Sequence, residues 1–249
     1  MLQSVQGIVI RSMDYGEGNK IIRLFTPELG KVGIMARGAK KLKSKHGAVT
    51  QLFTYGDFVF FKQRGQMGSL NGAEIIEAHH ALREDLHKSA YASYLAEMTD
   101  RMLADEEGNA FLFEQLRAGL MAIEEDKDMQ IITHLYEMKM FDLAGYLPVT
   151  DACVSCGETA GLTTFSPTLG GTLCLRCRHK DPSTIPIGEG TYKLLRLFPR
   201  MDMRRLGSVQ VKEETKAQLK LCMRTYMDVH IGVQWKSRGF IEQMEKYNI

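Results

Sequence analysis

Two short cysteine pairs constrain the fold of this chain more than any other feature. Cys153 and Cys156 form one C-x2-C pair, and Cys174 and Cys177 form a second one after seventeen intervening residues. This spacing is typical of zinc sites in which each pair turns two sulfur atoms towards one tetrahedral ion. Four thiolates fill the coordination sphere and leave no position for water or substrate. We therefore predict one structural Zn²⁺ per chain, held by these four cysteines.

Other uses of the cysteines fit the sequence less well. The first sixteen residues lack the basic stretch, apolar run and cleavage site of a signal peptide, so we expect a cytoplasmic protein, in which disulfides are rare. A redox C-x2-C pair requires a thioredoxin-like βαβ context, and the sequence does not contain one. His179 could compete as a metal ligand, but we expect it at the surface. Cys222 stands alone on a helical face and is interpreted as a core cysteine.

The first eighty residues have the pattern of a small β-barrel. Five stretches contain β-branched and aromatic residues and are separated by turns that contain glycine. Five strands in about eighty residues is the size of an OB-fold, a partly open barrel that commonly binds oligonucleotides. Periodicity alone does not separate this fold from an SH3-like barrel. The expected strands are 4–13, 19–27, 29–38, 53–65 and 68–80.

The pattern becomes helical after the barrel. Asn109 is a plausible N-cap, and Gly145 followed by Pro148 is a typical helix exit. Between the cysteine pairs the periodicity is lost, which indicates two strands and a turn, the body of a zinc ribbon. We expect the C-terminal stretch 238–249 to be short and only partly ordered. The expected helices lie within 82–108, 109–128, 129–148, 190–200 and 211–232.

These elements predict an α+β multidomain chain. An N-terminal OB-fold barrel would occupy residues 1–80, and a helical core domain would occupy 81–150. The four-cysteine zinc ribbon, 151–182, would be inserted in the helical domain. Residues 183–249 would form C-terminal helices that pack on the helical domain.

The charge is distributed unevenly along the chain. The net charge is +2, but residues 1–80 carry +5, residues 81–150 carry −8 and residues 151–249 carry +5. Such differences in net charge suggest that the three segments have different partners, although charges can also be distributed unevenly by chance. The stretch ARGAKKLKSKHG, residues 36–47, has one arginine and four lysines and no acidic residue. Basic clusters of this kind bind phosphate.

We therefore predict that the barrel binds nucleic acid through its cations and through stacking aromatic side chains. Stacking candidates are Tyr15, Phe53, Tyr55, Phe60 and Phe61. The predicted DNA-binding cations are Lys20 and Arg23 on the second strand, Arg37, Lys40, Lys41, Lys43 and Lys45 after the third, and Lys62 and Arg64 at the end of the fourth.

The sequence contains none of the common catalytic signatures that we sought. There is no GxxxxGK[ST] phosphate loop, no HExxH and no GxSxG. The adjacent His79 and His80 side chains should diverge, and no nucleophile–base pair is evident. No apolar run approaches the ~20 residues that span a bilayer. We therefore expect a binding protein rather than an enzyme, without a membrane or small-molecule partner.

Three stretches of the sequence resemble one known family. The opening GIVIRSMDYGEGNKIIRLFTPELGKVGIMARGAKKLKSKHGAVTQLFTYGDF, the stretch YLAEMTDRM and the stretch HLYEMKMFDLAGYLP, followed at once by the cysteine pairs, are similar to the RecO family of bacterial DNA repair proteins. The resemblance covers nearly the whole chain, and the last forty residues match only loosely. It implies a nucleoid-associated recombination mediator that is not a catalyst.

The resemblance also implies partners. Members of this family bind single- and double-stranded DNA, anneal complementary strands, contact the single-strand binding protein SSB and work with RecR to load RecA onto SSB-coated strands. An acidic and apolar SSB tail requires a basic rim beside an apolar pocket, which favours the +5 C-terminal segment. Candidate rim residues are Arg196, Arg200, Arg204 and Arg205.

Two other classes remain open from the residues themselves. OB barrels and zinc ribbons also occur in RNA-binding or translation-associated proteins. Alternatively, the chain is a structural scaffold whose basic loop is solvated and idle.

Overall fold

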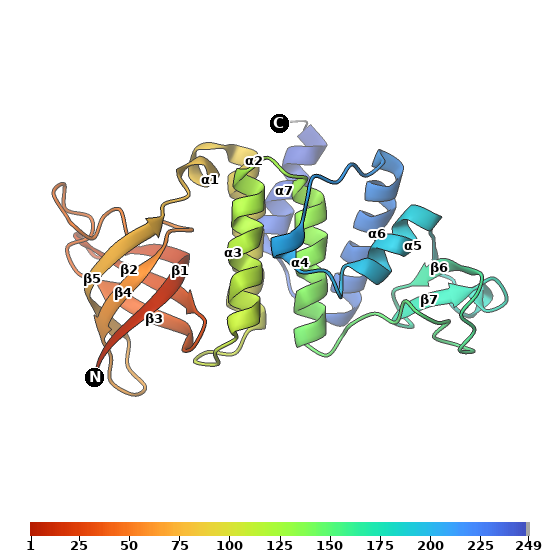
Figure 1. The fold of residues 1–249 in the computed structure, drawn as a ribbon, viewed down its shortest axis with the longest axis horizontal. Helices are drawn as coiled ribbons and strands as arrows, with labels where there is room; N and C mark the ends of the chain where they lie inside the picture. The colour runs from red at the N-terminus through yellow and green to blue at the C-terminus, as the bar shows by residue number, and fades with distance from the viewer. Residues whose placement is uncertain (248–249) are drawn as a thin grey trace. The chain divides into compact units, whose positions relative to one another are not determined.

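The computed structural model of the chain describes residues 1–247 and has the predicted α+β architecture. An N-terminal closed barrel and a helical region are present, as predicted (Figure 1). The predicted four-cysteine cluster is present as well. The chain divides into two compact units. Unit 1 comprises Met1–Asp126 and Trp235–Ile249, and unit 2 comprises Lys127–Gln234. Within the described part, no helix is long and apolar enough to cross a bilayer.

Five strands form the barrel of unit 1. Their order around the closed sheet is β1-β2-β3-β5-β4, which is the order of an OB-fold. Alternate residues point inwards, so that Ile22, Leu24 and Ile34 are buried in one core cluster with Phe58 and Phe60. The strands are β1 (Leu2–Tyr15), β2 (Asn19–Thr26), β3 (Gly30–Ala36), β4 (Tyr55–Phe61) and β5 (Gly68–Glu77).

Strand β1 closes the barrel because it pairs with two neighbours. Its first half runs from Leu2 to Ile8 against β4, and its second half runs against β2. The β1–β2 register shifts between Val9 and Arg11, which marks a bulge at the bend. The long strand β1 therefore joins β4 to β2, so that the barrel has no open edge there.

Three helices of unit 1 follow the barrel. The stretch predicted as one helix over 82–108 is interrupted at Asp85, whose carboxylate accepts a hydrogen bond from the Lys88 amide and starts a second helix. Asn109 caps the next helix as predicted, because its side chain accepts from the Leu112 amide at 2.9 Å. The helices are α1 (His80–Glu84), α2 (Leu86–Met102) and α3 (Ala110–Glu124).

The prediction of a short, partly ordered C-terminal stretch was wrong for residues 238–247, and residues 248 and 249 lie outside the described part of the chain. Helix α7 (Lys236–Tyr247) packs against α2, with Ile241 and Met244 buried. Its first amides are capped from far away in the sequence: the Glu97 carboxylate of α2 accepts from the amides of Lys236 and Ser237 at 3.1 and 2.8 Å. A carboxylate at this position also favours the positive end of the helix dipole.

Unit 2 contains the remaining helices and the cysteine insert. Asp128 caps α4 (Met129–Leu143), which ends before Gly145 at φ 74°, the exit predicted from the sequence. Helix α6 (Glu213–His230) packs against α4 and α5 (Glu189–Leu197). The insert contains β6 (Leu162–Ser166), β7 (Gly171–Cys174) and β8 (Ile185–Pro186) in the order β7-β6-β8. The domain division at residues 80, 150 and 182 stays a prediction.

Candidate nucleic-acid interface and metal centre

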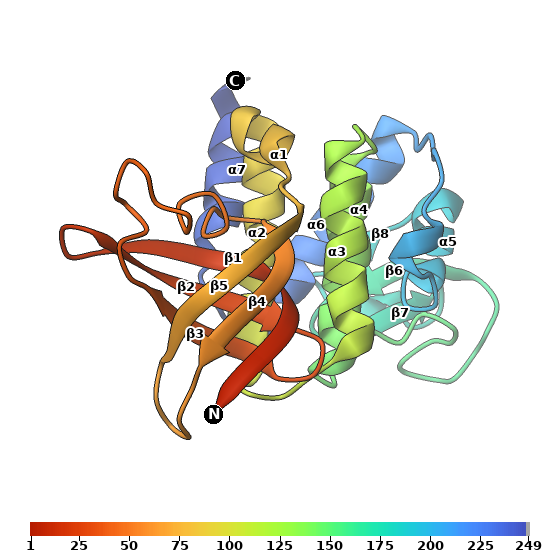
Figure 2. The ribbon, with the colours of Figure 1, turned by 60° about the vertical axis from the view of Figure 1, so that its left-hand side comes forward.

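The basic stretch of the sequence lies in the loop between β3 and β4, and its first residues are fixed to the β1–β2 turn. The Gly38 amide donates to Asn19 Oδ1 at 2.9 Å, and the Lys40 amide donates to the Gly18 carbonyl at 3.1 Å. The turn and the loop extend from the same side of the barrel (Figure 2). The loop therefore starts from a defined position beside the β1–β2 turn.

The rest of this loop is a succession of hydrogen-bonded turns. The Lys41 amide donates to the Gly38 carbonyl, and the Ser44 amide donates to the Lys41 carbonyl at 2.9 Å. Ala39 and Val49 are buried in the core of the barrel. Because two of its residues are buried there, the loop holds its lysines in a limited set of positions.

Six of the nine predicted cations have no carboxylate within ion-pair distance in the described part of the chain. Five of these side chains are exposed, and Lys20 is half-buried. Exposed cations without carboxylate partners attract phosphates without regard to sequence. The six are Lys20, Arg37, Lys41, Lys43, Lys45 and Arg64.

Arg23, by contrast, is part of an ion-pair network that holds the barrel to the helices of unit 1. Its guanidinium contacts Asp100 at 2.9 Å and Asp105 at 2.6 Å. The buried Lys31 contacts the same Asp105 carboxylate at 3.0 Å. Burial opposes ionisation of Asp105, but the hydrogen bonds and charges of Lys31 and Arg23 keep the pKa of its carboxyl below the usual value. Arg23 therefore has a structural role here.

Two further predicted cations are also paired. Lys40 Nζ lies 2.8 Å from Asp14 Oδ2, and this hydrogen bond lowers the pKa of Asp14. Lys62 forms an ion pair with Glu106 and is largely covered. A phosphate would have to displace a carboxylate to reach either ammonium group.

The aromatic candidates separate into two groups. Phe53, Tyr55 and Phe60 are buried, so the prediction that they could stack on bases was wrong. Their rings fill the interior of unit 1, as most phenylalanines in a small barrel do. Tyr15 and Phe61 remain exposed.

Sequence reasoning missed a set of methionines on the outer face of the barrel. Met13, Met35 and Met67 lie on or beside the strands next to the basic loop. Side chains along a strand point alternately into the barrel and outwards, and this alternation is the signal that could have identified the methionines as outward-facing. They were not recognised because methionine is usually interpreted as a core residue.

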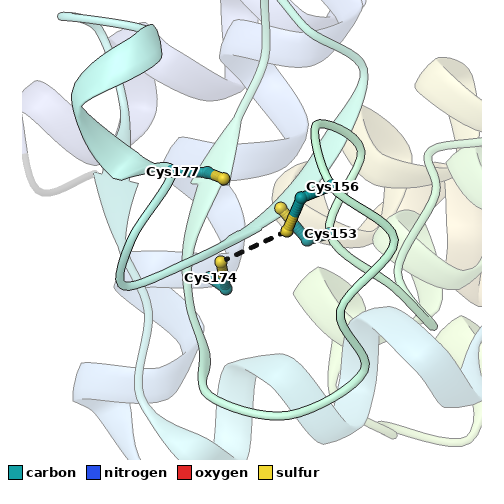
Figure 3. A group of neighbouring side chains, drawn as sticks. All are labelled: Cys153, Cys156, Cys174 and Cys177. Atoms are coloured by element: carbon teal, nitrogen blue, oxygen red, sulfur yellow. Dashed lines mark hydrogen bonds between the residues drawn. The ribbon is translucent and has the colours of Figure 1, made fainter.

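The four predicted cysteines come together in unit 2. Their sulfur atoms all lie within 4.8 Å of one another, and Cys156 Sγ lies 3.7 Å from Cys174 Sγ. Figure 3 shows the two pairs facing each other from separate turns. Bonds of about 2.3 Å at tetrahedral angles place two sulfur ligands about 3.8 Å apart. The arrangement therefore fits four ligands of one metal ion.

The backbone around the cysteines stabilises thiolates. Burial opposes ionisation of Cys153, but backbone amides that include those of Cys174, Ser155 and Cys156 lower its pKa to about 6. Cys174 also has a lowered pKa, because amides of Cys177 and Arg176 outweigh its burial. Thiolates are the form that binds metal, so the turns favour the ligand state of Cys153 and Cys174. A backbone hydrogen bond from Glu158 lowers the pKa of Cys156, but contacts with the sulfurs of Cys177 and Cys153 outweigh it and raise that pKa to about 11.

The cysteines also form the small core of the insert. Three of them are buried in one cluster with Leu162 and Leu173. Without a metal ion, this cluster is a very small apolar core for the three short strands around it. His179 is exposed and lies outside the group of sulfurs, as expected. Cys222 is buried in α6, which raises its pKa to about 12 and agrees with a core role.

Three of the four partner-binding candidates form ion pairs inside unit 2. Arg196 and Arg200 both contact the Asp151 carboxylate at 2.8 Å. Arg204 contacts Asp202 at 2.6 Å. Arg205 follows it in the same short turn and is exposed.

A pocket of about 460 Å³ lies beside the first two of these arginines. Its wall is apolar at Leu147, Pro148, Val149 and Pro199. The polar part of the lining consists of Arg196, Arg200, Thr150 and two aspartates. Leu147 and Val149 expose more than a third of their surface. Two of the predicted rim residues, Arg196 and Arg200, therefore lie beside an apolar surface.

Comparison with known proteins adds independent findings. Residues 1–79 match the family model "Recombination protein O N terminal", and residues 83–239 match "Recombination protein O C terminal". The chain is 44% identical to the DNA repair protein RecO of Bacillus cereus strain B4264 and 43% identical to that of Bacillus cytotoxicus, in both cases over 249 residues and all of each chain. It is also 44% identical to RecO of Bacillus anthracis. The chain belongs to the RecO family of DNA repair proteins.

Proposed function

We propose that this chain is a recombination mediator that binds and anneals single-stranded DNA and, with RecR, helps load RecA onto strands coated with SSB. It acts by binding and strand exchange rather than by catalysis, in the cytoplasm and at the nucleoid. The observation that supports the proposal best is the β3–β4 loop, which is anchored to the barrel and presents four cations without carboxylate partners in the described part of the chain: Arg37, Lys41, Lys43 and Lys45.

We propose further that the four cysteines bind one structural Zn²⁺. The ion would cross-link the two turns of the insert and would take no part in a chemical step, because four sulfur ligands leave it no open position. The close approach of the four sulfurs and the lowered pKa values of two of them support this assignment.

The test of the mediator is annealing of complementary strands coated with SSB, with and without RecR, across a salt series. We expect faster annealing in the presence of the protein and a rate that falls as salt rises, because phosphate contacts weaken. A protein that anneals RNA but not SSB-coated DNA would instead support the RNA-binding alternative. A protein that accelerates neither reaction would support a scaffold.

The unit 2 pocket is the proposed docking site for the C-terminal tail of SSB. A tail that ends in carboxylates and apolar side chains would place its apolar part on Leu147 and Val149 and its charge on Arg196 and Arg200. Asp151 holds the two guanidinium groups side by side, and a tail carboxylate would displace Asp151 or share the two groups with it.

A titration with a fluorescent tail peptide tests this site. We expect the double variant Arg196→Glu, Arg200→Glu to weaken binding at least about tenfold, because two attractive charges become repulsive. Lys212→Glu, a reversal of an exposed charge in the same unit, should leave the affinity unchanged. Equal affinity of the double variant and the unaltered protein would contradict this placement.

A further inference from the structure

The four-cysteine insert and the unit 2 pocket share a segment of backbone. Val149, which lines the pocket, forms a β-bridge with Gly171 of β7. Its amide donates to the Gly170 carbonyl at 2.9 Å, and its carbonyl accepts from the Thr172 amide at 2.8 Å. The two backbones approach so closely that a Cβ atom on Gly171 would lie 2.1 Å from the Val149 carbonyl oxygen. One wall of the pocket is therefore fastened directly to the insert.

The cysteines lie at the ends of the two segments that are joined in this way. Cys153 follows four residues after Val149, and Cys174 is the last residue of β7. The Val154 amide donates to the Thr172 carbonyl at 2.9 Å, so the two segments stay paired as far as the cysteines. Sulfur ligands from both segments would cross-link them at one metal ion. Without that cross-link, only the small cysteine-rich core supports the attachment of Val149.

One cysteine of the cluster differs from the others in its exposure. Cys153, Cys174 and Cys177 are buried, whereas Cys156 is exposed. All four sulfurs are thiolates when they hold a metal ion, so exposure decides which of them an oxidant reaches first. Cys156 Sγ lies 3.7 Å from Cys174 Sγ, along the dashed line in Figure 3. A second thiolate therefore lies next to the accessible one, as disulfide formation requires.

We propose that Cys156 is an oxidation site, and that a peroxide acting there opens the metal site and loosens the wall of the unit 2 pocket. This inference rests on the proposed zinc site and on the proposed docking site for the tail. It adds a control to them: the pocket would bind its peptide only while the cysteines of the insert are reduced.

The chemistry has two steps. The Cys156 thiolate attacks one oxygen of hydrogen peroxide, the O–O bond breaks, and the hydroxide that leaves takes up a proton to become water. The Cys174 thiolate then attacks the sulfur of the sulfenic acid, so that an S–S bond forms, the S–O bond breaks and a second hydroxide leaves and is protonated. The two sulfurs lose two electrons, and the peroxide is reduced to two molecules of water. The disulfide removes two of the four ligands, and with them the cross-link between the segments.

A first measurement identifies the site in the unaltered protein. The zinc-loaded protein is treated with limiting hydrogen peroxide and a reagent that traps sulfenic acids, and mass spectrometry then locates the label. We expect label on Cys156 before any of the four buried cysteines. Label that appears first on a buried cysteine would overturn the inference.

A histidine variant tests whether this thiol controls release of the metal. Cys156→His keeps four ligands, because three cysteines and one histidine are a common zinc set. With a chromogenic zinc chelator as readout, we expect peroxide to release zinc at least about tenfold more slowly from this variant than from the unaltered protein. The matched control, Cys177→His, replaces a buried ligand and keeps Cys156, so it should still lose zinc rapidly. Methionines are oxidised alike in both variants, and equal release rates in the two would contradict the proposal.

The effect on the pocket is measured with the fluorescent tail peptide after the peroxide has been removed. The oxidised protein should bind it at least about tenfold more weakly, because the apolar contact with Val149 is lost. Cys156→His treated in the same way should keep its affinity, and a thiol reductant with Zn²⁺ should restore binding to the oxidised protein. Zinc release with unchanged peptide affinity would refute the link between insert and pocket. If the untreated protein held no zinc or did not bind the peptide, the proposed zinc site or docking site would itself fail, and the inference with it.

Discussion

Replacing Cys174 with serine is expected to remove the bound Zn²⁺ and to unfold the four-cysteine insert of unit 2. Zinc content, measured after exhaustive dialysis, should fall from one ion per chain to nearly zero. Structural zinc sites contribute on the order of 10 kcal/mol to the folding of small domains. Without the ion, the three strands of the insert have only the small cluster around Leu162 and Leu173 as an apolar core. Their amide hydrogens should then exchange rapidly with solvent.

Cys222→Ala is the control for this result. Cys222 is buried in α6, away from the sulfur cluster, and its raised pKa keeps it a thiol. The variant should keep one ion per chain, although loss of a buried sulfur lowers stability somewhat. DNA binding by the barrel should survive in both variants, because the barrel belongs to unit 1. A Cys174→Ser protein that retains a full complement of zinc would contradict the assignment.

Reversing three charges of the β3–β4 loop should have the second large effect. The variant Lys41→Glu, Lys43→Glu, Lys45→Glu replaces three exposed cations that lack carboxylate partners in the described chain. We expect at least about a hundredfold loss of single-strand affinity at low salt. The slope of log affinity against log salt should shrink by about 0.7 for each phosphate that is no longer bound, or about 2 for all three. Binding titrations at several salt concentrations measure both quantities.

Two comparisons make this prediction specific to the loop. Reversal of Lys193, Lys212 and Lys246, three exposed lysines outside the barrel, changes the net charge equally and should have little effect. Lys40→Ala should reduce the affinity for single-stranded DNA less than removal of an unpaired loop lysine does, because Lys40 already pairs with Asp14. An unchanged salt slope in the triple loop variant would mean that the loop does not touch phosphate.

The sequence predicted the elements whose signals are local. Five barrel strands were recognised from alternation and glycine turns, and the Asn109 cap and the Gly145 exit were placed correctly because both depend on neighbouring residues. The cysteine cluster was predicted from spacing alone, since a C-x2-C turn fixes the direction of its own thiolates.

Features that depend on distant residues were missed. Helix α7 was expected to be partly ordered, because neither its cap, Glu97, nor its packing partner α2 is adjacent in the sequence. The ion pairs of Arg23 with two aspartates much later in the chain were not foreseen, and its contact with DNA stays a prediction. Burial of Phe53 and Phe60 likewise follows from closure of the barrel, and composition does not distinguish an inward from an outward aromatic ring.

The capping of α7 by Glu97 also has a consequence for the order in which the chain can fold. Unit 1 is discontinuous, because residues 127–234 separate its barrel and first helices from α7. During translation, the barrel and α2 leave the ribosome early, and the partner of α2 follows only after all of unit 2 has been made. Until then, the surface of α2 that packs against α7 has no partner there. A nascent chain of this protein therefore exposes an apolar helix face that a chaperone could shield.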